Sequence, residues 1–125
     1  MRTAGLILGG VLSVCASSAM ASGDMSVATF LAKADALKAK GLGALGSPDI
    51  KLLRKEAEAG GAIYRARLQS DKAEGKPPHS CPPKSASTNS DQFLSHLRSY
   101  PAAARPRTTI TTAVFDLMKK RYPCP

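Results

Sequence analysis

Apolar residues recur every three or four positions in four separate stretches of this chain. The first stretch covers residues 26–40, and its apolar positions are Val27, Phe30, Leu31, Ala34 and Leu37. This period predicts a helix with one buried face, and the hydroxyl of Ser26 can cap its first turn. Gly41 and Gly43 follow, so we expect the helix to end near Lys40. The stretch up to Gly46 is predicted to be a short loop whose leucines turn inward.

The second stretch covers residues 47–73 and has the strongest helix start in the chain. Ser47 can serve as N-cap, Pro48 suits the first helical position, and Asp49 faces the positive end of the helix dipole. The apolar line consists of Ile50, Leu53, Ala57, Gly60 or Gly61, Tyr64 and Leu68. Each glycine of the pair Gly60-Gly61 costs about 1 kcal/mol relative to alanine. A close crossing with another helix would favour bare Cα atoms there, and a kink or a ligand contact are the alternatives.

Two shorter helices follow a polar, proline-bearing connector that covers residues 70–90. The helix near 90–99 is capped by Asn89 or Ser90, and the helix near 109–121 is capped by Thr108 or Thr109. Their buried positions are Phe93, Leu94 and Leu97 in the first, and Ile110, Ala113, Val114, Leu117 and Met118 in the second. No segment has a convincing strand pattern. The sequence therefore predicts an all-α fold, a small bundle of about four helices near 26–40, 47–73, 90–99 and 109–121.

The first 21 residues have the pattern of a signal peptide. Arg2 gives a positive start, an apolar run covers residues 6–14, and Ala19-Met20-Ala21 has the small residues that signal peptidase recognises. We therefore expect cleavage after Ala21, a periplasmic protein and a single helical domain over residues 22–125. The apolar run is shorter than the roughly 20 residues that a membrane-spanning helix needs, which argues against a stable membrane anchor.

Cleavage at this position would also remove one cysteine and one positive charge. Cys15 would leave with the signal peptide, and lipidation of Cys15 is disfavoured because Val14 is bulky where a small residue is expected. Loss of Arg2 would lower the formal net charge of +9 by one. The new terminus, residues 22–24, is expected to be frayed.

Two cysteines, Cys81 and Cys124, remain in the exported chain, and prolines flank both. An even number of cysteines in an oxidising compartment favours a disulfide, and closing this loop would stabilise the fold by about 4 kcal/mol. A metal site is an alternative, but two distant cysteines with only His79 and His96 to help lack the usual zinc spacing. A catalytic Cys/His pair would leave the other cysteine as a free thiol. We therefore expect a disulfide and no metal.

No catalytic arrangement is recognisable among the titratable residues. The candidates are Glu56, Glu58, Asp91, Asp116, His79 and His96. Glu56 and Glu58 are two residues apart on a helix and face different directions. The two aspartates lie on predicted helix surfaces without an obvious partner, and a lone histidine such as His96, beside Leu97, is typical of a half-buried helix residue. We expect no catalytic residue, no cofactor and no enzymatic activity.

Positive charge is the remaining lead from composition. Lys and Arg number 18 against 9 for Asp and Glu. Such a surface would attract nucleic acid, anionic lipid or an acidic protein, and more weakly as salt rises. Export and the scattered positions of Tyr64, Tyr100 and Tyr122 argue against nucleic acid. The charge then serves as a solvated surface, as a binding face for an acidic partner protein, or as the binding face of an adaptor module for an anionic envelope component.

The second half of the chain resembles the Rap/Tai family of small exported immunity proteins. The resemblance lies in Ser80-Cys81-Pro82-Pro83, in the helix Asp91-Gln92-Phe93-Leu94-Ser95-His96-Leu97-Arg98-Ser99-Tyr100-Pro101-Ala102, and in the ending from Ala113 to Tyr122-Pro123-Cys124. In that family a Cys-Pro precedes a helix that ends in proline, and the chain closes on an aromatic-Pro-Cys. The family commonly has further cysteine and Gly-Tyr features upstream, where this chain has only Gly60-Gly61-Ala62-Ile63-Tyr64.

The resemblance implies an all-helical periplasmic protein that blocks a peptidoglycan amidase toxin of type VI secretion. It also implies that Cys81 and Cys124 form a disulfide, and it allows a homodimer. Residues that contact the toxin vary within the family, so none is carried over to this chain. An inhibitor of this kind would occlude the toxin's cleft with an exposed loop such as 76–89 and the neighbouring helix ends.

Overall fold

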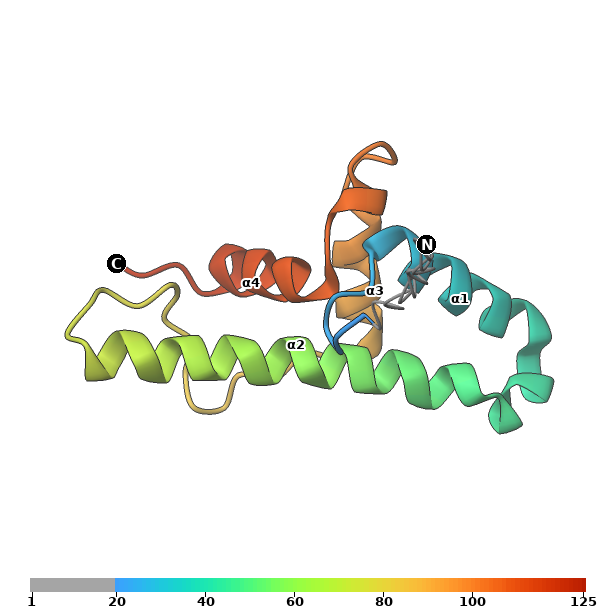
Figure 1. Ribbon diagram of the computed structural model, residues 1–125, viewed down its shortest axis with the longest axis horizontal. Helices are drawn as coiled ribbons and strands as arrows, with labels where there is room; N and C mark the ends of the chain where they lie inside the picture. Colours follow the sequence, from blue (N-terminus) through green and yellow to red (C-terminus); the bar gives the residue numbers. More distant parts are fainter. Residues whose placement is uncertain (1–19) are drawn as a thin grey trace, which may run out of the picture.

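The computed structural model describes residues 20–125, and four α-helices account for most of that part of the chain (Figure 1). They are α1 (Val27–Lys40), α2 (Pro48–Ala73), α3 (Ser90–Arg98) and α4 (Ile110–Arg121), with the 3₁₀ turns η1 (Gly41–Gly46) and η2 (Arg105–Arg107) between them. Residues 20–125 contain no strand beyond an isolated bridge between Ser26 and Thr109. The predicted all-α fold with four helices is confirmed. The predicted signal peptide and Cys15 lie outside the described residues, except for residues 20 and 21.

The helices begin where local capping chemistry places them. Ser26 accepts a hydrogen bond from the backbone of Thr29, and Ser47 accepts one from Asp49. Asn89 rather than Ser90 caps α3, in a capping box with Gln92, and Thr109 rather than Thr108 caps α4. Each cap satisfies a backbone N–H that the first turn leaves without a partner.

Helix α2 is the long element on which the other helices pack. Its 26 residues extend about 39 Å, and Figure 1 shows α4 lying along one half of it and α1 beside the other half, while α3 runs crosswise. α4 comes close at Gly60, where an added Cβ would lie 3.1 Å from Cγ2 of Val114 and 3.4 Å from Cα of Thr111. The close-crossing interpretation is therefore confirmed for Gly60. Gly61 faces outward, where such a Cβ would approach only the Arg65 side chain.

The core lies where α1, α3 and α4 meet the first half of α2. Its buried members are Val27, Phe30, Leu31, Leu53, Leu97, Ile110 and Ala113. Phe93 packs edge-to-face on Phe30 with ring centroids 5.6 Å apart, although Phe93 itself is only partly buried. The core is small and depends on residues from all four helices.

The segment before α1 is held between α2 and α4, so the expectation of a frayed terminus at residues 22–24 is wrong at Gly23. Gly23 is buried, and its N–H donates to Oε2 of Glu56 at 2.7 Å while its carbonyl accepts from the Thr111 backbone at 3.0 Å. Met25 donates to the same carboxylate at 3.3 Å. Gly23 has φ +98°, a left-handed conformation that glycine adopts without strain. These long-range bonds fix the segment as part of the fold.

The two leucines of η1 do not turn inward as predicted. Leu42 is 87% exposed and Leu45 is 78% exposed, whereas the intervening Ala44 is buried. Residues 41–46 form a 3₁₀ turn rather than an irregular loop. A turn this tight at the end of a two-helix hairpin lies too far from the core to bury both side chains, so it buries only its small central alanine.

Within residues 20–125, no helix combines the length and the apolar character that crossing a bilayer requires.

The two adjacent glycines of α2 should respond oppositely to alanine. Gly61→Ala should stabilise the protein by about 0.5–1 kcal/mol, because alanine favours the helix and only a flexible arginine must move. Gly60→Ala should destabilise it by about 1 kcal/mol, because the new Cβ pushes α4 away from α2. Urea unfolding of the two variants tests this pair, and equal effects would contradict the close crossing.

Glu56 should be essential for docking the segment before α1. Glu56→Ala leaves the buried N–H of Gly23 and that of Met25 without their acceptor, which should cost about 2–4 kcal/mol of the free energy of unfolding. Glu58→Ala, on the exposed side of the same helix, is the control and should change stability by less than about 0.5 kcal/mol. Similar chemical denaturation midpoints for the two variants would show that the carboxylate does not hold this segment.

Candidate functional site

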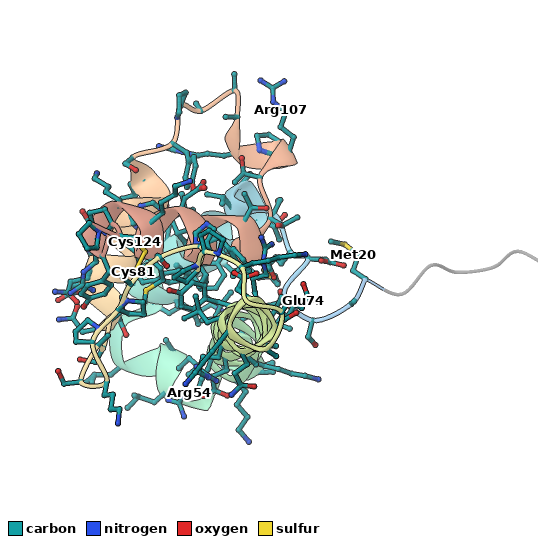
Figure 2. The ribbon with its side chains drawn as sticks, turned by 90° about the vertical axis from the view of Figure 1, so that its left-hand side faces the viewer. Met20, Arg54, Glu74, Cys81, Arg107 and Cys124 are labelled. Carbon is teal, nitrogen blue, oxygen red and sulfur yellow. A yellow bond between two sulfur atoms is a disulfide. The ribbon has the colours of Figure 1, made fainter. Side chains whose placement is uncertain are left out.

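A disulfide joins Cys81 to Cys124, as predicted, and ties the end of α4 to the connector between α2 and α3. The two Cα atoms are 5.0 Å apart, and the sulfur bridge lies beside α2 in the end-on view of Figure 2. The backbone supports the same junction, because the N–H of Cys81 donates to the carbonyl of Tyr122 at 2.8 Å. Because α2 continues to Ala73 and α3 begins at Ser90, the connector comprises residues 74–89 in the structure. It is fixed near its middle to the residues that follow α4.

The start of the connector is organised by Asp71, a buried carboxylate in the last turns of α2. Its Oδ1 accepts from Nε of Arg67 at 2.9 Å, and its Oδ2 accepts from the backbone of His79 at 3.2 Å. Its carbonyl also accepts from the N–H of Lys76 at 2.8 Å. The hydrogen bond from Arg67 holds the pKa of Asp71 below its ordinary value, against the opposing effect of burial. This aspartate thereby closes the turn that reverses the chain after α2.

An aromatic cluster holds the connector just before Cys81. Ser80 is 1% exposed, and its hydroxyl is hydrogen-bonded to that of Tyr64 on α2. The ring of Tyr64 packs edge-to-face on Phe115 of α4, and the ring centroid of His79 lies 5.0 Å from that of Phe115. Burial, followed by the charges of Lys119 and Arg67, lowers the pKa of His79. Neutral His79 at pH 7 fits this apolar packing.

Ser80, His79 and Asp71 do not have the geometry of a catalytic triad, although all three residue types are close together. Nδ1 of His79 is 3.3 Å from Oγ of Ser80, but Asp71 bonds the backbone N–H of His79 and not its ring. The Ser80 hydroxyl is also buried against Tyr64, so no substrate carbonyl could reach it. What this cluster does is position the connector.

The exposed part of the connector is a turn followed by a second attachment. The N–H of Ala86 donates to the carbonyl of Pro83 at 3.0 Å, which closes a turn that presents Lys84 and Ser85 to solvent. Farther on, Nη1 of Arg121 donates to the carbonyl of Ser87 at 3.2 Å. Although the connector contains no helix or strand, its two ends and its middle are all bonded to α2 or α4.

A groove borders the connector and runs along the side of α2 that faces α1, α3 and α4. It consists of two hollows of about 410 and 380 Å³ that share Ala57, Glu58, Ser90 and Phe93. In the first hollow, residues 86–90 of the connector and α3 face α2 and the side chains of Val114, Leu117 and Met118 on α4. The floor is mainly apolar, and Arg54, Glu58 and Arg65 supply charge along α2. Gly61 also lines the first hollow.

A second polar cluster lies on the other side of the core, between α3 and α4. The hydroxyl of Tyr100 donates to Oδ2 of Asp116 at 2.5 Å, and Nε2 of His96 is 2.9 Å from the carbonyl of Ala113. Because a carbonyl can only accept, Nε2 of His96 carries the proton. Burial lowers the pKa of His96, and burial together with Asp116 raises the pKa of Tyr100. The expectation that Asp116 lacks a partner is therefore wrong.

The remaining titratable residues considered from the sequence are dispersed. Glu56 is buried against the segment before α1, Glu58 lines the groove, and Asp91 is exposed in the first turn of α3. His79 and His96 belong to different clusters. Within residues 20–125, no group of three or more His, Cys, Asp or Glu side chains could hold a metal ion. Positive charge is not confined to one side, since Arg54 and Arg107 lie on opposite sides of the molecule (Figure 2).

Sequence reasoning missed three features of this region. It placed Phe93 and Leu94 on a buried face, and both do pack against the core, but it did not predict that they also line the groove. It also gave no role to Asp71 or Ser80, because their partners are supplied by chain reversal and by α2. One signal for the role of Asp71 was present in the polar run that ends α2. An aspartate shortly before Pro77-Pro78 can accept hydrogen bonds from the backbone N–H groups of the turn that follows.

Stability should fall on mild acidification, partly because of His96. In the unfolded chain His96 takes up a proton near its ordinary pKa of 6.5, but in the folded protein burial lowers that pKa. The contribution of neutral His96 is thus present above pH 6.5 and is lost as the pH falls below it. His96→Gln keeps a donor for the carbonyl of Ala113, so its unfolding free energy should fall less between pH 7.5 and pH 5.5 than that of the unchanged protein. His79 contributes the same pH dependence to the variant and to the unchanged protein. Equal slopes would therefore show that His96 makes no contribution of its own.

No family model, curated protein or solved structure matches this chain. The resemblance to the Rap/Tai family therefore rests on the residues quoted for it between 80 and 125. What the resemblance implies about activity enters below only as a proposal.

Proposed function

We propose that this chain is a small exported binding protein of the periplasm that inhibits a peptidoglycan amidase toxin of type VI secretion. In this proposal the signal peptide is removed after Ala21, and the protein acts by occupying the toxin's substrate cleft. The observation that carries the proposal is the connector, an exposed segment that is bonded to the helices at its start, middle and end. A segment ordered before binding loses less conformational entropy when it docks.

The disulfide supports the same proposal in two ways. It occurs at the two cysteine positions on which the resemblance to the Rap/Tai family depends. It also suits an oxidising compartment, because exposed cysteine pairs such as this one are kept reduced in the cytosol.

The turn Pro83–Ala86 and the adjoining hollow together offer a binding surface with two complementary parts. The turn presents Lys84 and Ser85, and the hollow has an apolar floor formed by Ala57, Phe93 and Val114. A protruding element beside an apolar recess is typical of protein partners, because the recess can take an anchoring side chain while the turn enters the partner's own cleft.

Inhibition of an amidase is the direct test of this proposal. The purified protein should suppress cleavage of peptidoglycan by the amidase-type toxin that is encoded next to it or captured by it from a periplasmic extract. Ser85→Arg, which adds bulk to the exposed turn, should weaken inhibition at least tenfold with no change in thermal stability. Gln69→Arg, at an exposed position of α2, is the matched control and should inhibit like the unchanged protein.

Two outcomes would contradict the proposal. If no amidase is captured or inhibited, the toxin is not the partner. If Ser85→Arg and Gln69→Arg inhibit as strongly as the unchanged chain, the connector does not contact the toxin, and another surface must be responsible.

A further inference from the structure

The tip of the hairpin between α1 and α2 presents two leucines directly to solvent. Leu42 and Leu45 are the most exposed large apolar side chains among residues 20–125. They are three residues apart in η1, and in a 3₁₀ helix side chains at that spacing lie on the same face. They therefore form one apolar projection.

This projection is rigidly supported. Ala44 is buried, the N–H of Ser47 donates to its carbonyl at 2.9 Å, and the N–H of Gly41 donates to the carbonyl of Lys38. No atom within 4 Å would meet a Cβ at Gly43 or Gly46, so these glycines are not required by packing. They leave the leucines as the only bulky side chains on the tip. Leu52, in the second turn of α2, adds a partly exposed third leucine nearby in sequence.

Cations flank the projection on both helices. The exposed basic residues within about two turns of it are Lys38, Lys40, Lys51, Arg54 and Lys55. None of the five makes an ion pair with another residue of the described chain. The two acidic residues nearest the tip are each paired with another cation, Asp35 with Arg98 at 2.7 Å and Asp49 with Lys33 at 3.2 Å. The tip is therefore apolar at its end and strongly positive around it.

We propose that the hairpin tip, formed by Leu42 and Leu45 within these five cations, binds the surface of a bilayer that contains anionic phospholipid. Charge complementarity selects this partner. Lipid phosphates attract the cations, each of which strengthens binding near an anionic surface, and the leucines can then enter the acyl region. A convex pair of leucines suits a deformable bilayer, whereas a protein partner would offer buried area only if it were concave at this point.

The tip lies at the start of α2, whereas the connector leaves the end of α2 and runs back to its middle, so membrane binding and partner binding can occur together. In Figure 1 the hairpin turns at the right-hand end of α2, while the connector leaves α2 at the left-hand end, close to the C-terminus. The lipid proposal does not depend on the identity of any toxin. It describes a reversible attachment of the exported protein to a membrane surface, without a spanning helix.

Vesicle co-sedimentation tests this inference. The exported form of the protein should bind phosphatidylglycerol-containing vesicles at low salt and should bind pure phosphatidylcholine vesicles at least tenfold more weakly. The double variant Leu42→Ser/Leu45→Ser should lower binding to the anionic vesicles about tenfold or more. Lys38→Gln/Lys40→Gln should lower it by a similar factor and reduce its dependence on salt.

Matched controls separate the tip from general effects of charge and hydrophobicity. Ile63→Ser removes a large apolar side chain that is 45% exposed in the middle of α2, and Lys72→Gln removes a cation at its far end. Both should bind anionic vesicles like the unchanged protein. Thermal unfolding should be unchanged in the leucine variant, because neither leucine is packed against the core.

Three results would overturn the inference. The first is equal binding, or no binding, to both kinds of vesicle. The second is unchanged binding by the leucine variant, which would show that charge alone attracts the protein. The third is loss of self-association on mutating the leucines, measured by analytical ultracentrifugation, with vesicle binding intact; the tip would then be an interface between two copies of the chain.

Discussion

The close contact between α2 and α4 at Gly60 is the constraint that orders most of this fold. Because Gly60 has no side chain, the backbone of α4 can pack against it, in contact with the position that a Cβ atom would occupy. The approach places Thr111 of α4 and Glu56 of α2 on the two sides of Gly23, which is bonded to both. The segment before α1 is thereby fixed, and with it the start of the helix that supplies Val27 and Phe30 to the core.

The same contact determines how the second half of the chain is organised. Because α4 lies along α2, its last turn ends beside the connector, where Cys124 meets Cys81 and Arg121 meets Ser87. Phe115 and Tyr64, which face each other across the two helices, provide the apolar support for His79. The connector is thus ordered by tertiary bonds in place of secondary structure, and this order would lower the entropic penalty of docking on the proposed partner.

The parts of the fold that could be predicted from the sequence are those that depend on neighbouring residues. Ser47, Asn89 and Thr109 begin their helices through bonds within a single turn, and the period of apolar residues identifies each buried face. The disulfide was predictable because the expected export, with loss of Cys15, would leave an even number of cysteines in an oxidising compartment. Gly60 could be assigned to a helix crossing because its cost requires compensation, although its partner helix could not be identified.

Failures of prediction occurred where the outcome depends on distant parts of the chain. Gly23 is ordered by a carboxylate 33 residues away, and Asp116 finds its partner on another element, across a turn. Leu42 and Leu45 look like core residues in the sequence, but their position at the end of a hairpin keeps them in solvent. The groove arises from the spacing of helices, which no local pattern encodes. The exposed loop 76–89 could be proposed from the sequence as the partner surface. The groove beside it and the exposed hairpin tip could be found only in three dimensions.

Hydrogen exchange of individual backbone amides would establish whether the disulfide and its neighbouring bonds hold the connector in one conformation. In the oxidised protein, the amides of Lys76, His79 and Cys81 should exchange far more slowly than those of an unstructured peptide, because each donates a hydrogen bond within the protein. Reduction of the disulfide should speed exchange at Cys81 while the amides of α2 around Gly60 remain protected. Rapid exchange of all three connector amides in the oxidised protein would contradict an ordered connector.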